Sequence, residues 1–124
     1  MKKNEAKWQT VFNQYLREKK HPGFFELKVT VTKTLPLAKI RKVQYEGLQA
    51  TERDGLVWKL SDQDQRPKPC DTISIPPLPS YLVIKFPDAF YFIRIEEVVK
   101  IRDGGAISIT LSQAKEIAEK ILYV

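Results

Sequence analysis

The sequence predicts a single α/β domain in which helices flank a mixed β-sheet. Three observations support this fold class. Segments with helical periodicity alternate with segments of strand-like alternation. Two nearly uniform apolar runs, YLVIKF and AFYFIRI, are typical of buried central strands. The 124 residues suffice for one hydrophobic core but not for two, so we expect one domain over residues 1–124 with the order α-β-α-β-β-β-β-α.

An amphipathic helix is expected over residues 4–20. Asn4 is a suitable N-cap, and the triplet His21-Pro22-Gly23 ends the periodic segment. Its apolar stripe recurs at helical spacing and consists of Trp8, Val11, Phe12, Tyr15 and Leu16.

A strand is expected next, at FFELKVTV, residues 24–31, where apolar and polar residues alternate. One face carries Phe25, Leu27, Val29 and Val31, and the other carries Glu26, Lys28 and Thr30. Pro36 then fits the start of a second helix that runs to about Ala50. The stripe of this helix is Leu37, Ile40, Gln44 and Leu48.

Strands dominate the chain after Asp54-Gly55. They are expected at 56–60, 71–75, 81–86 and 89–95, with a polar loop before the second of them. A short helix is expected at 96–101. A last helix is expected over TLSQAKEIAEKIL, where Thr110 and Gln113 form a capping box and Ala114, Ile117, Ala118 and Ile121 form a packing stripe.

Composition narrows the classes of function. The net charge of +6 favours polyanionic partners, nucleic acid first, although many basic proteins bind no specific anion. The basic residues cluster at 17–20, 39–42 and 66–68. With Cys70 and His21 as the sole cysteine and histidine, thiol, zinc and Ser-His chemistry are disfavoured. No apolar run could span a bilayer or act as a secretion signal, so a cytoplasmic location without a membrane partner is expected.

Several polar residues interrupt the apolar pattern. Glu5 shares the stripe of the first helix, Gln44 interrupts that of the second, and Glu26 and Lys28 share a strand face between them. Each has an ordinary explanation: a helix-dipole contact for Glu5, a stripe border for Gln44, and a surface ion pair for the strand residues. Their coincidence in three consecutive elements indicates a shared polar site.

These elements resemble the PD-(D/E)XK nuclease superfamily. The resemblance rests on E-L-K within a strand, the Thr-rich stretch TVTKT, a Leu-Pro-Leu entry to a helix, and Gln44 followed four residues later by Leu48. It is greatest for Holliday-junction resolvases of the bacterial recombination-U type and small phage-encoded relatives. In that branch the helix reads H-Q-x-x-x-L, and Val43 stands here in place of the histidine. SYLVIKFPDAFYFIRIEEVV is also similar to the strands and helix that follow, so the likeness covers about residues 4–100.

The resemblance implies a restriction-endonuclease-like core and a Mg²⁺-dependent DNA endonuclease, with Mn²⁺ as a substitute. Glu5 and Glu26 would bind the metal, with the carbonyl of Leu27 as a further ligand. Lys28 would orient or activate the attacking water, and Gln44 would position the water or the phosphate. Such a ligand set is sufficient in kind for Mg²⁺.

One departure from the family pattern concerns an aspartate. The family normally has this aspartate on a separate strand, upstream of E-x-K. No aspartate lies between Glu5 and Glu26. Asp71, at the start of a later strand, is the candidate replacement, on the hypothesis that a rearranged connectivity brings it beside Glu26. A capping role for Asp71 in the proline-rich loop is the alternative.

The expected substrate is branched DNA or a recombination intermediate such as a Holliday junction. Phosphate contacts are expected from Lys19, Lys20, Lys39, Arg41 and Lys42. A homodimer is expected because resolvases cut two strands symmetrically. Two alternatives remain: a catalytically inactive nucleic-acid-binding protein of the same fold, and a nuclease for nicked, flapped or single-stranded DNA.

Overall fold

The computed structural model describes residues 2–60 and 69–124. Its elements are α1 (Lys2–Lys19), β1 (Phe24–Val29), β2 (Thr34–Pro36), the 3₁₀ helix η1 (Leu37–Lys39), α2 (Lys42–Asp54), β3 (Leu56–Lys59), β4 (Thr72–Ile75), β5 (Ser80–Lys85), β6 (Ala89–Arg94), α3 (Ile95–Asp103), β7 (Ser108–Thr110), α4 (Leu111–Ile117) and β8 (Lys120–Tyr123). The chain is a mixed α/β protein, and none of its described helices has the length and apolar composition needed to cross a bilayer.

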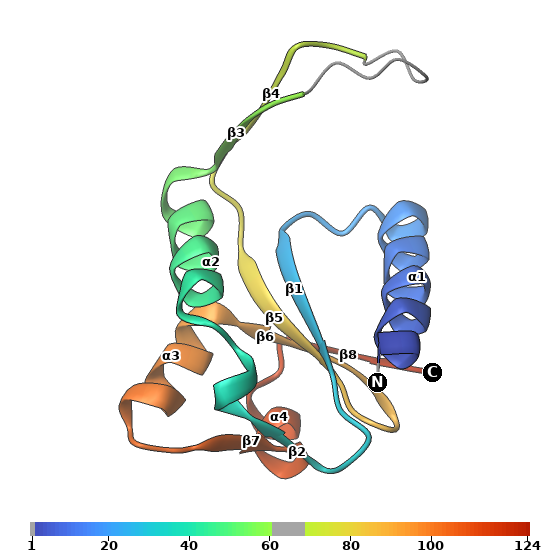
Figure 1. Cartoon of the computed structure of the whole chain (residues 1–124), viewed down its shortest axis with the longest axis vertical. Coiled ribbons are helices and arrows are strands. Elements are labelled where there is room, and N and C mark those ends of the chain that lie inside the picture. Colours follow the sequence, from blue (N-terminus) through green and yellow to red (C-terminus); the bar gives the residue numbers. More distant parts are fainter. Residues whose placement is uncertain (1, 61–68) are drawn as a thin grey trace.

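A four-stranded mixed sheet forms the centre of the molecule, in the order β1-β5-β6-β8 (Figure 1). β1 runs parallel to β5, whereas the other two pairings are antiparallel. The two apolar runs predicted as neighbouring core strands are β5 and β6, and both are almost completely buried. β1 therefore lies at one edge of this sheet, between α1 and α2 in Figure 1.

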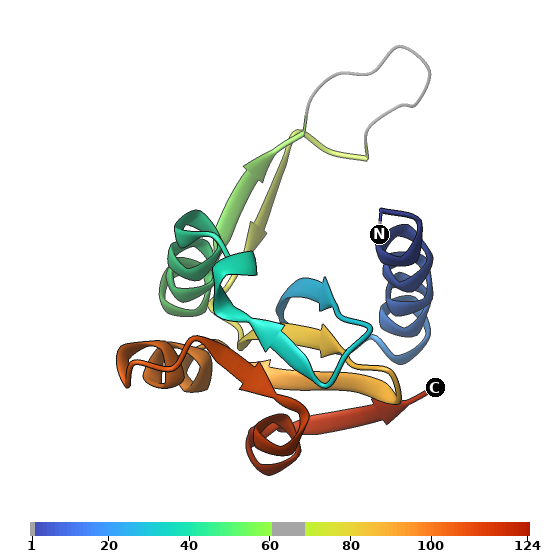
Figure 2. The ribbon, with the colours of Figure 1, turned by 60° about the horizontal axis from the view of Figure 1, so that its bottom comes forward.

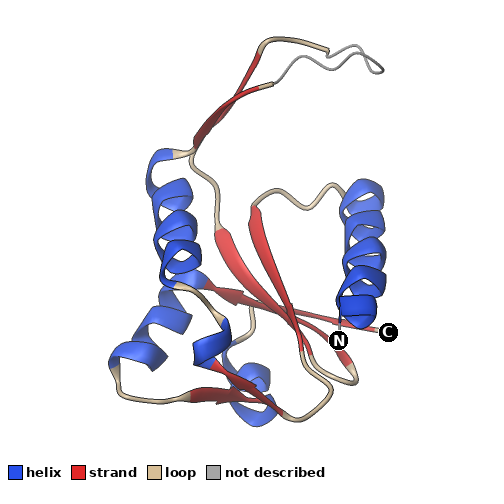
Figure 3. Ribbon diagram, viewed as in Figure 1, coloured by secondary structure: helices blue, strands red, loops and turns tan. Residues whose placement is uncertain are grey.

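The two faces of the sheet carry two separate cores. α1 covers one face, where Phe12 packs among aromatic side chains of β1, β5 and β6. Residues of α2, α3 and α4 cover the other face, which Figure 3 shows opposite α1. Because side chains alternate along a strand, each residue of β1 faces either α1 or α2.

The first helix begins earlier than its sequence suggests. α1 already includes Lys2, so the prediction of Asn4 as N-cap is wrong. It ends at Lys19, and Lys20 follows with a left-handed φ of 52°, just before the predicted terminating triplet. Phe12 is buried, but Val11 is 37% exposed because the sheet contacts only one side of the helix.

The second helix begins later than predicted. Thr34–Pro36 forms β2 and pairs with β7, and a single 3₁₀ turn follows before α2 starts at Lys42. Strand pairing with a segment about 74 residues away thus overrides the local signal of Pro36. α2 then continues to Asp54, beyond the expected end at Ala50.

The C-terminal segment divides into a short helix and a strand. The predicted capping box is confirmed, since Gln113 N–H donates to Thr110 Oγ1 at 3.2 Å and Thr110 N–H donates to Gln113 Oε1 at 2.9 Å. However, α4 ends at Ile117, and β8 pairs with β6. Ile121 and Leu122 consequently pack into opposite cores, which a helix with one apolar stripe does not allow.

A two-stranded ribbon, β3 with β4, stands away from the central sheet (Figure 2). Trp58 and Ile73 lie directly opposite each other on it, and Trp58 is 60% exposed. Asp71 belongs to this ribbon, because its carbonyl accepts a hydrogen bond from Leu60 N–H at 2.9 Å. The predicted polar loop and its basic cluster at 66–68 lie outside the described residues.

Candidate functional site

The candidate site follows the edge formed by β1. Phe24 packs into the core on the α2 side, whereas Phe25 and Leu27 pack against α1. Glu26 and Lys28 therefore point to the α2 side, next to Leu82 and Ile84 in the register with β5. The alternation predicted from FFELKVTV is thus confirmed over β1.

Glu26 and Lys28 form an ion pair, with 4.0 Å between Lys28 Nζ and Glu26 Oε2. Their side chains are 33% and 17% exposed, respectively. Lys28 is unusually covered for a lysine, since most lysines are solvated. The ion pair is thus partly buried and still reaches solvent.

A groove of about 480 Å³ lies between the start of β1 and α2; we call it the α2 groove. Glu26 and Gln44 both line it. Gln44 is half-buried, and its Oε1 accepts a hydrogen bond from Arg41 N–H at 2.9 Å, which caps α2. The structure therefore brings Gln44 to the same groove as Glu26, and the cap fixes its amide there.

Gly47 also lines the α2 groove and was not identified from the sequence. A Cβ added to Gly47 would meet no atom within 4 Å. A glycine inside a helix lowers helix stability, so its presence at this position was the signal that could have indicated a groove.

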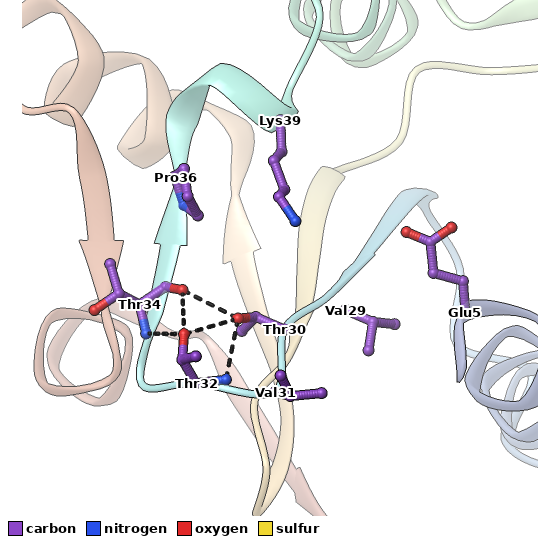
Figure 4. Close-up of a pocket in the computed structure, with 8 residues that line it drawn as sticks. All are labelled: Glu5, Val29, Thr30, Val31, Thr32, Thr34, Pro36 and Lys39. Atoms are coloured by element: carbon purple, nitrogen blue, oxygen red, sulfur yellow. Dashed lines mark hydrogen bonds between the residues drawn. The ribbon is translucent and has the colours of Figure 1, made fainter. Parts of the chain in front are cut away.

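A second pocket, of about 340 Å³, opens where β1 ends (Figure 4); we call it the threonine pocket. Glu5 comes to it from α1 and Lys39 from η1. Three threonines form its lower rim. Thr30 Oγ1 and Thr32 Oγ1 lie 3.1 Å apart, and both hydroxyls donate to the carbonyl of Thr34, at 3.1 and 3.0 Å. These bonds shape the turn that the Thr-rich stretch encodes.

Glu5 is placed by the anchoring of α1 on the sheet. Lys85 is 3% exposed, and its Nζ lies 4.2 Å from the centroid of the Trp8 ring. The same Nζ donates to the carbonyls of Phe86 and Pro87, at 2.6 and 3.2 Å, and burial lowers the pKa of Lys85. Because Glu5 precedes Trp8 by one helical turn, this contact turns Glu5 toward the end of β1.

A polar network anchors α2 at its other end. Glu52 Oε1 accepts from Arg94 Nη2 at 2.5 Å and from Ser80 N–H at 3.2 Å. This hydrogen bond raises the pKa of Arg94. Tyr81 Oη donates to Glu119, and burial with this hydrogen bond raises the pKa of Tyr81 to about 12. The network ties the end of α2 to β5 and β6 and so fixes the wall of the α2 groove.

The predicted metal set is not assembled. Within residues 5–60 and 69–124, no three His, Cys, Asp or Glu side chains lie close enough to hold a metal ion. The reason is geometric: Glu26 faces α2, Glu5 belongs to the helix on the opposite face, and Asp71 pairs with Leu60 at the β3–β4 ribbon. Figure 1 shows this ribbon projecting away from the sheet. The hypothesis that Asp71 lies beside Glu26 is therefore wrong, and so is the three-carboxylate site.

One carboxylate of the predicted metal set, that of Glu26, lines the α2 groove. Mg²⁺ is often bound by one or two carboxylates, with water and substrate phosphate oxygens as the remaining ligands. Glu26 is accessible and adjoins the Leu27 carbonyl, so the residues suit an ion shared with a substrate. They do not suit one held by the protein alone.

The five predicted phosphate-binding residues are exposed and fall into two groups. Lys19 and Lys20 end α1, whereas Lys39, Arg41 and Lys42 lie at the junction of η1 and α2. Lys39 lines the threonine pocket, and Lys42 pairs with Glu46 at 3.6 Å. The second group therefore lies directly beside the candidate site.

No protein-family model, curated protein or solved structure matches this chain.

Proposed function

We propose that this chain is a DNA endonuclease with a restriction-endonuclease-like core that hydrolyses phosphodiester bonds with Mg²⁺, and that it acts on branched DNA such as Holliday junctions. The observation that carries the proposal is the partly buried ion pair of Glu26 with Lys28, whose Glu26 lines the α2 groove together with Gln44. A carboxylate, an amine and an amide are the groups needed to bind and orient a phosphate and a water.

In the proposed reaction a water oxygen attacks phosphorus and the water gives up a proton to solvent, while the bond from phosphorus to the leaving sugar oxygen breaks and that oxygen takes up a proton from solvent. The metal would supply charge neutralisation on the phosphate. Glu26 would hold the ion, Lys28 would orient the water and stabilise the added negative charge, and Gln44 would hold the phosphate in register. Lys39, Arg41 and Lys42 would contact neighbouring phosphates.

A second candidate is a DNA-binding protein without nuclease activity. The observation that favours it is the lack of a three-residue metal group among the side chains that the structure describes.

One experiment separates the two candidates. A labelled four-way junction and a linear duplex of the same sequence are incubated with the protein in Mg²⁺, Mn²⁺ or EDTA. The proposal expects cleavage of the junction with either metal and none in EDTA. Binding without cleavage would support the second candidate, and cleavage of nicked or flapped DNA in preference to the junction would redefine the substrate. Sedimentation with and without the junction tests the expected homodimer.

A further inference from the structure

A third cavity, of about 430 Å³, lies on the far side of the segment that carries the second basic group. We call it the Tyr45 pocket. Its apolar walls come from Leu37, Ile40 and Tyr45, and its rim carries Lys42, Arg102 and Ile107. The volume is in the range of pockets that hold small organic ligands. No step of the proposed hydrolysis uses it.

The rim residues of the Tyr45 pocket are poised to stack on a flat ring. Ile107 is 85% exposed, so its apolar side chain can contact a ligand that enters at the rim. The Arg102 guanidinium lies 4.5 Å from the centroid of the Tyr45 ring. Arg102 is itself exposed and pairs with its neighbour Asp103 at 3.1 Å, so it can leave the ring without disturbing the core.

Tyr45 adds a polar group that lacks a partner. The side chain is 4% exposed, and its hydroxyl is buried without a hydrogen-bond partner among the described residues. Burial raises the pKa of Tyr45, which keeps the hydroxyl protonated as a donor. A buried polar group without a partner is costly, so a ligand that supplies one when Arg102 moves gains affinity.

The basic segment connects this pocket to the candidate site. Within four residues of chain, Lys39 lines the threonine pocket and Lys42 lines the Tyr45 pocket. The ion pair of Lys42 with Glu46 is exposed and contributes little, so Lys42 remains able to bind phosphate. A DNA strand whose phosphates follow residues 39–42 would thus pass from the β1 edge to the Tyr45 pocket.

We infer that the Tyr45 pocket receives one unpaired nucleobase of the DNA bound at the β1 edge. The base stacks between Ile107 and the Arg102 guanidinium once Arg102 has left the Tyr45 ring, its edge accepts a hydrogen bond from the Tyr45 hydroxyl, and Lys42 contacts its phosphate. Paired bases cannot enter, so the pocket selects DNA with unpaired nucleotides, as found at branches and flaps. This inference rests on the proposed function.

The test compares equilibrium binding of a perfect duplex with that of the same duplex carrying one unpaired thymine, in EDTA so that no cleavage occurs. We expect the unpaired thymine to increase affinity about tenfold. Ile107→Asp should abolish this preference, because it places a charge on the stacking rim. Val57→Asp is the matched control, since Val57 is 71% exposed on the β3–β4 ribbon, and it should retain the preference.

Tyr45→Phe keeps the ring and removes only the hydroxyl, which bonds to no described residue, so the variant should fold. It should bind the duplex as wild type does and the unpaired-thymine DNA about fivefold more weakly. Full binding of that DNA by Tyr45→Phe would overturn the role of the hydroxyl, and a preference that survives in Ile107→Asp would overturn the pocket as its source.

The failures of the two proposals are distinguishable. If the protein binds neither DNA and also fails to cleave junctions with Mg²⁺, both the proposed function and this inference are wrong. If it cleaves junctions with Mg²⁺ but binds duplex and unpaired-thymine DNA equally, only this inference is wrong.

Discussion

Glu52 and Arg94, which lie 42 residues apart in the chain, meet with 2.5 Å between Glu52 Oε1 and Arg94 Nη2. Both side chains are mostly buried, at 25% and 29% exposure. The contact joins the last turns of α2 to the end of β6, so the α2 groove depends on a residue that is far from it in sequence.

Arg94→Met should lower the free energy of unfolding by about 2 kcal/mol, because Glu52 would be left mostly buried and without its charged partner. The measurement is urea denaturation at neutral pH. Arg53→Met is the matched control: its pair with Asp54 is exposed, so the loss should stay below about 0.5 kcal/mol. Equal losses in the two variants would contradict the anchoring role of Arg94.

Gly47, in the interior of α2, and Gly55, the C-cap of that helix, should respond in opposite directions to alanine. At Gly55 φ is 75°, and an added Cβ would lie 2.2 Å from the Ile75 carbonyl oxygen, so Gly55→Ala should cost about 2 kcal/mol or more. Gly47→Ala should stabilise by about 0.5–1 kcal/mol, because its helical position has open space. Thermal denaturation of the two variants and of wild type measures both predicted changes in stability. If Gly47→Ala is less stable than wild type, the space beside Gly47 is not open in the folded protein.

His21 should make the stability of the protein depend on pH. Burial lowers its pKa from 6.5, and Lys120 lowers it further, against the opposing effect of Glu119. Because the unfolded chain takes up the proton more readily, His21 contributes stability above about pH 6.5 that is lost as the pH falls through its lowered pKa.

His21→Phe should keep the stacking on Phe92, where the ring centroids lie 5.3 Å apart, and remove this titration. Urea denaturation at pH 7.5 and pH 5 should therefore show a smaller loss in the variant than in wild type. The Tyr15 hydroxyl lies 3.4 Å from His21 Nδ1, and the Tyr81 ring also packs against the imidazole. An equal loss in both proteins would rule out His21 as the group responsible.

Glu26→Gln and Lys28→Met should each lower metal-dependent cleavage of a four-way junction by about 100-fold or more. The reason is that each removes a charged group of the proposed pair while keeping the size of the side chain. Junction binding in EDTA should remain close to that of wild type. Glu116→Gln and Lys115→Met, on the exposed side of α4, are matched controls and should cleave normally. Wild-type cleavage by either Glu26→Gln or Lys28→Met would refute the site assignment.

Local sequence patterns determined much of the secondary structure. Alternation in FFELKVTV placed Glu26 and Lys28 on one face, the uniform apolar runs identified β5 and β6, and Thr110 with Gln113 marked the start of α4. These features arise from the periodicity and capping of residues that are close together in the chain, so a local pattern suffices to predict them. The helical stripe also predicted Gln44 on a helix, but its position beside Glu26 depends on the packing of α2 near β1.

Only the tertiary structure decided which residues meet. The spacing of Ile121 from Ala114, Ile117 and Ala118 fits a helix, yet the segment around Ile121 can also form a strand. Its pairing with β6 decides in favour of the strand. Asp71 was expected beside Glu26, but pairing of β3 with β4 holds it on the ribbon, and the pleat of β1 turns Glu26 away from the helix that carries Glu5. Such outcomes depend on backbone partners dozens of residues away and on which sheet face each helix covers, and neither is encoded in a local pattern.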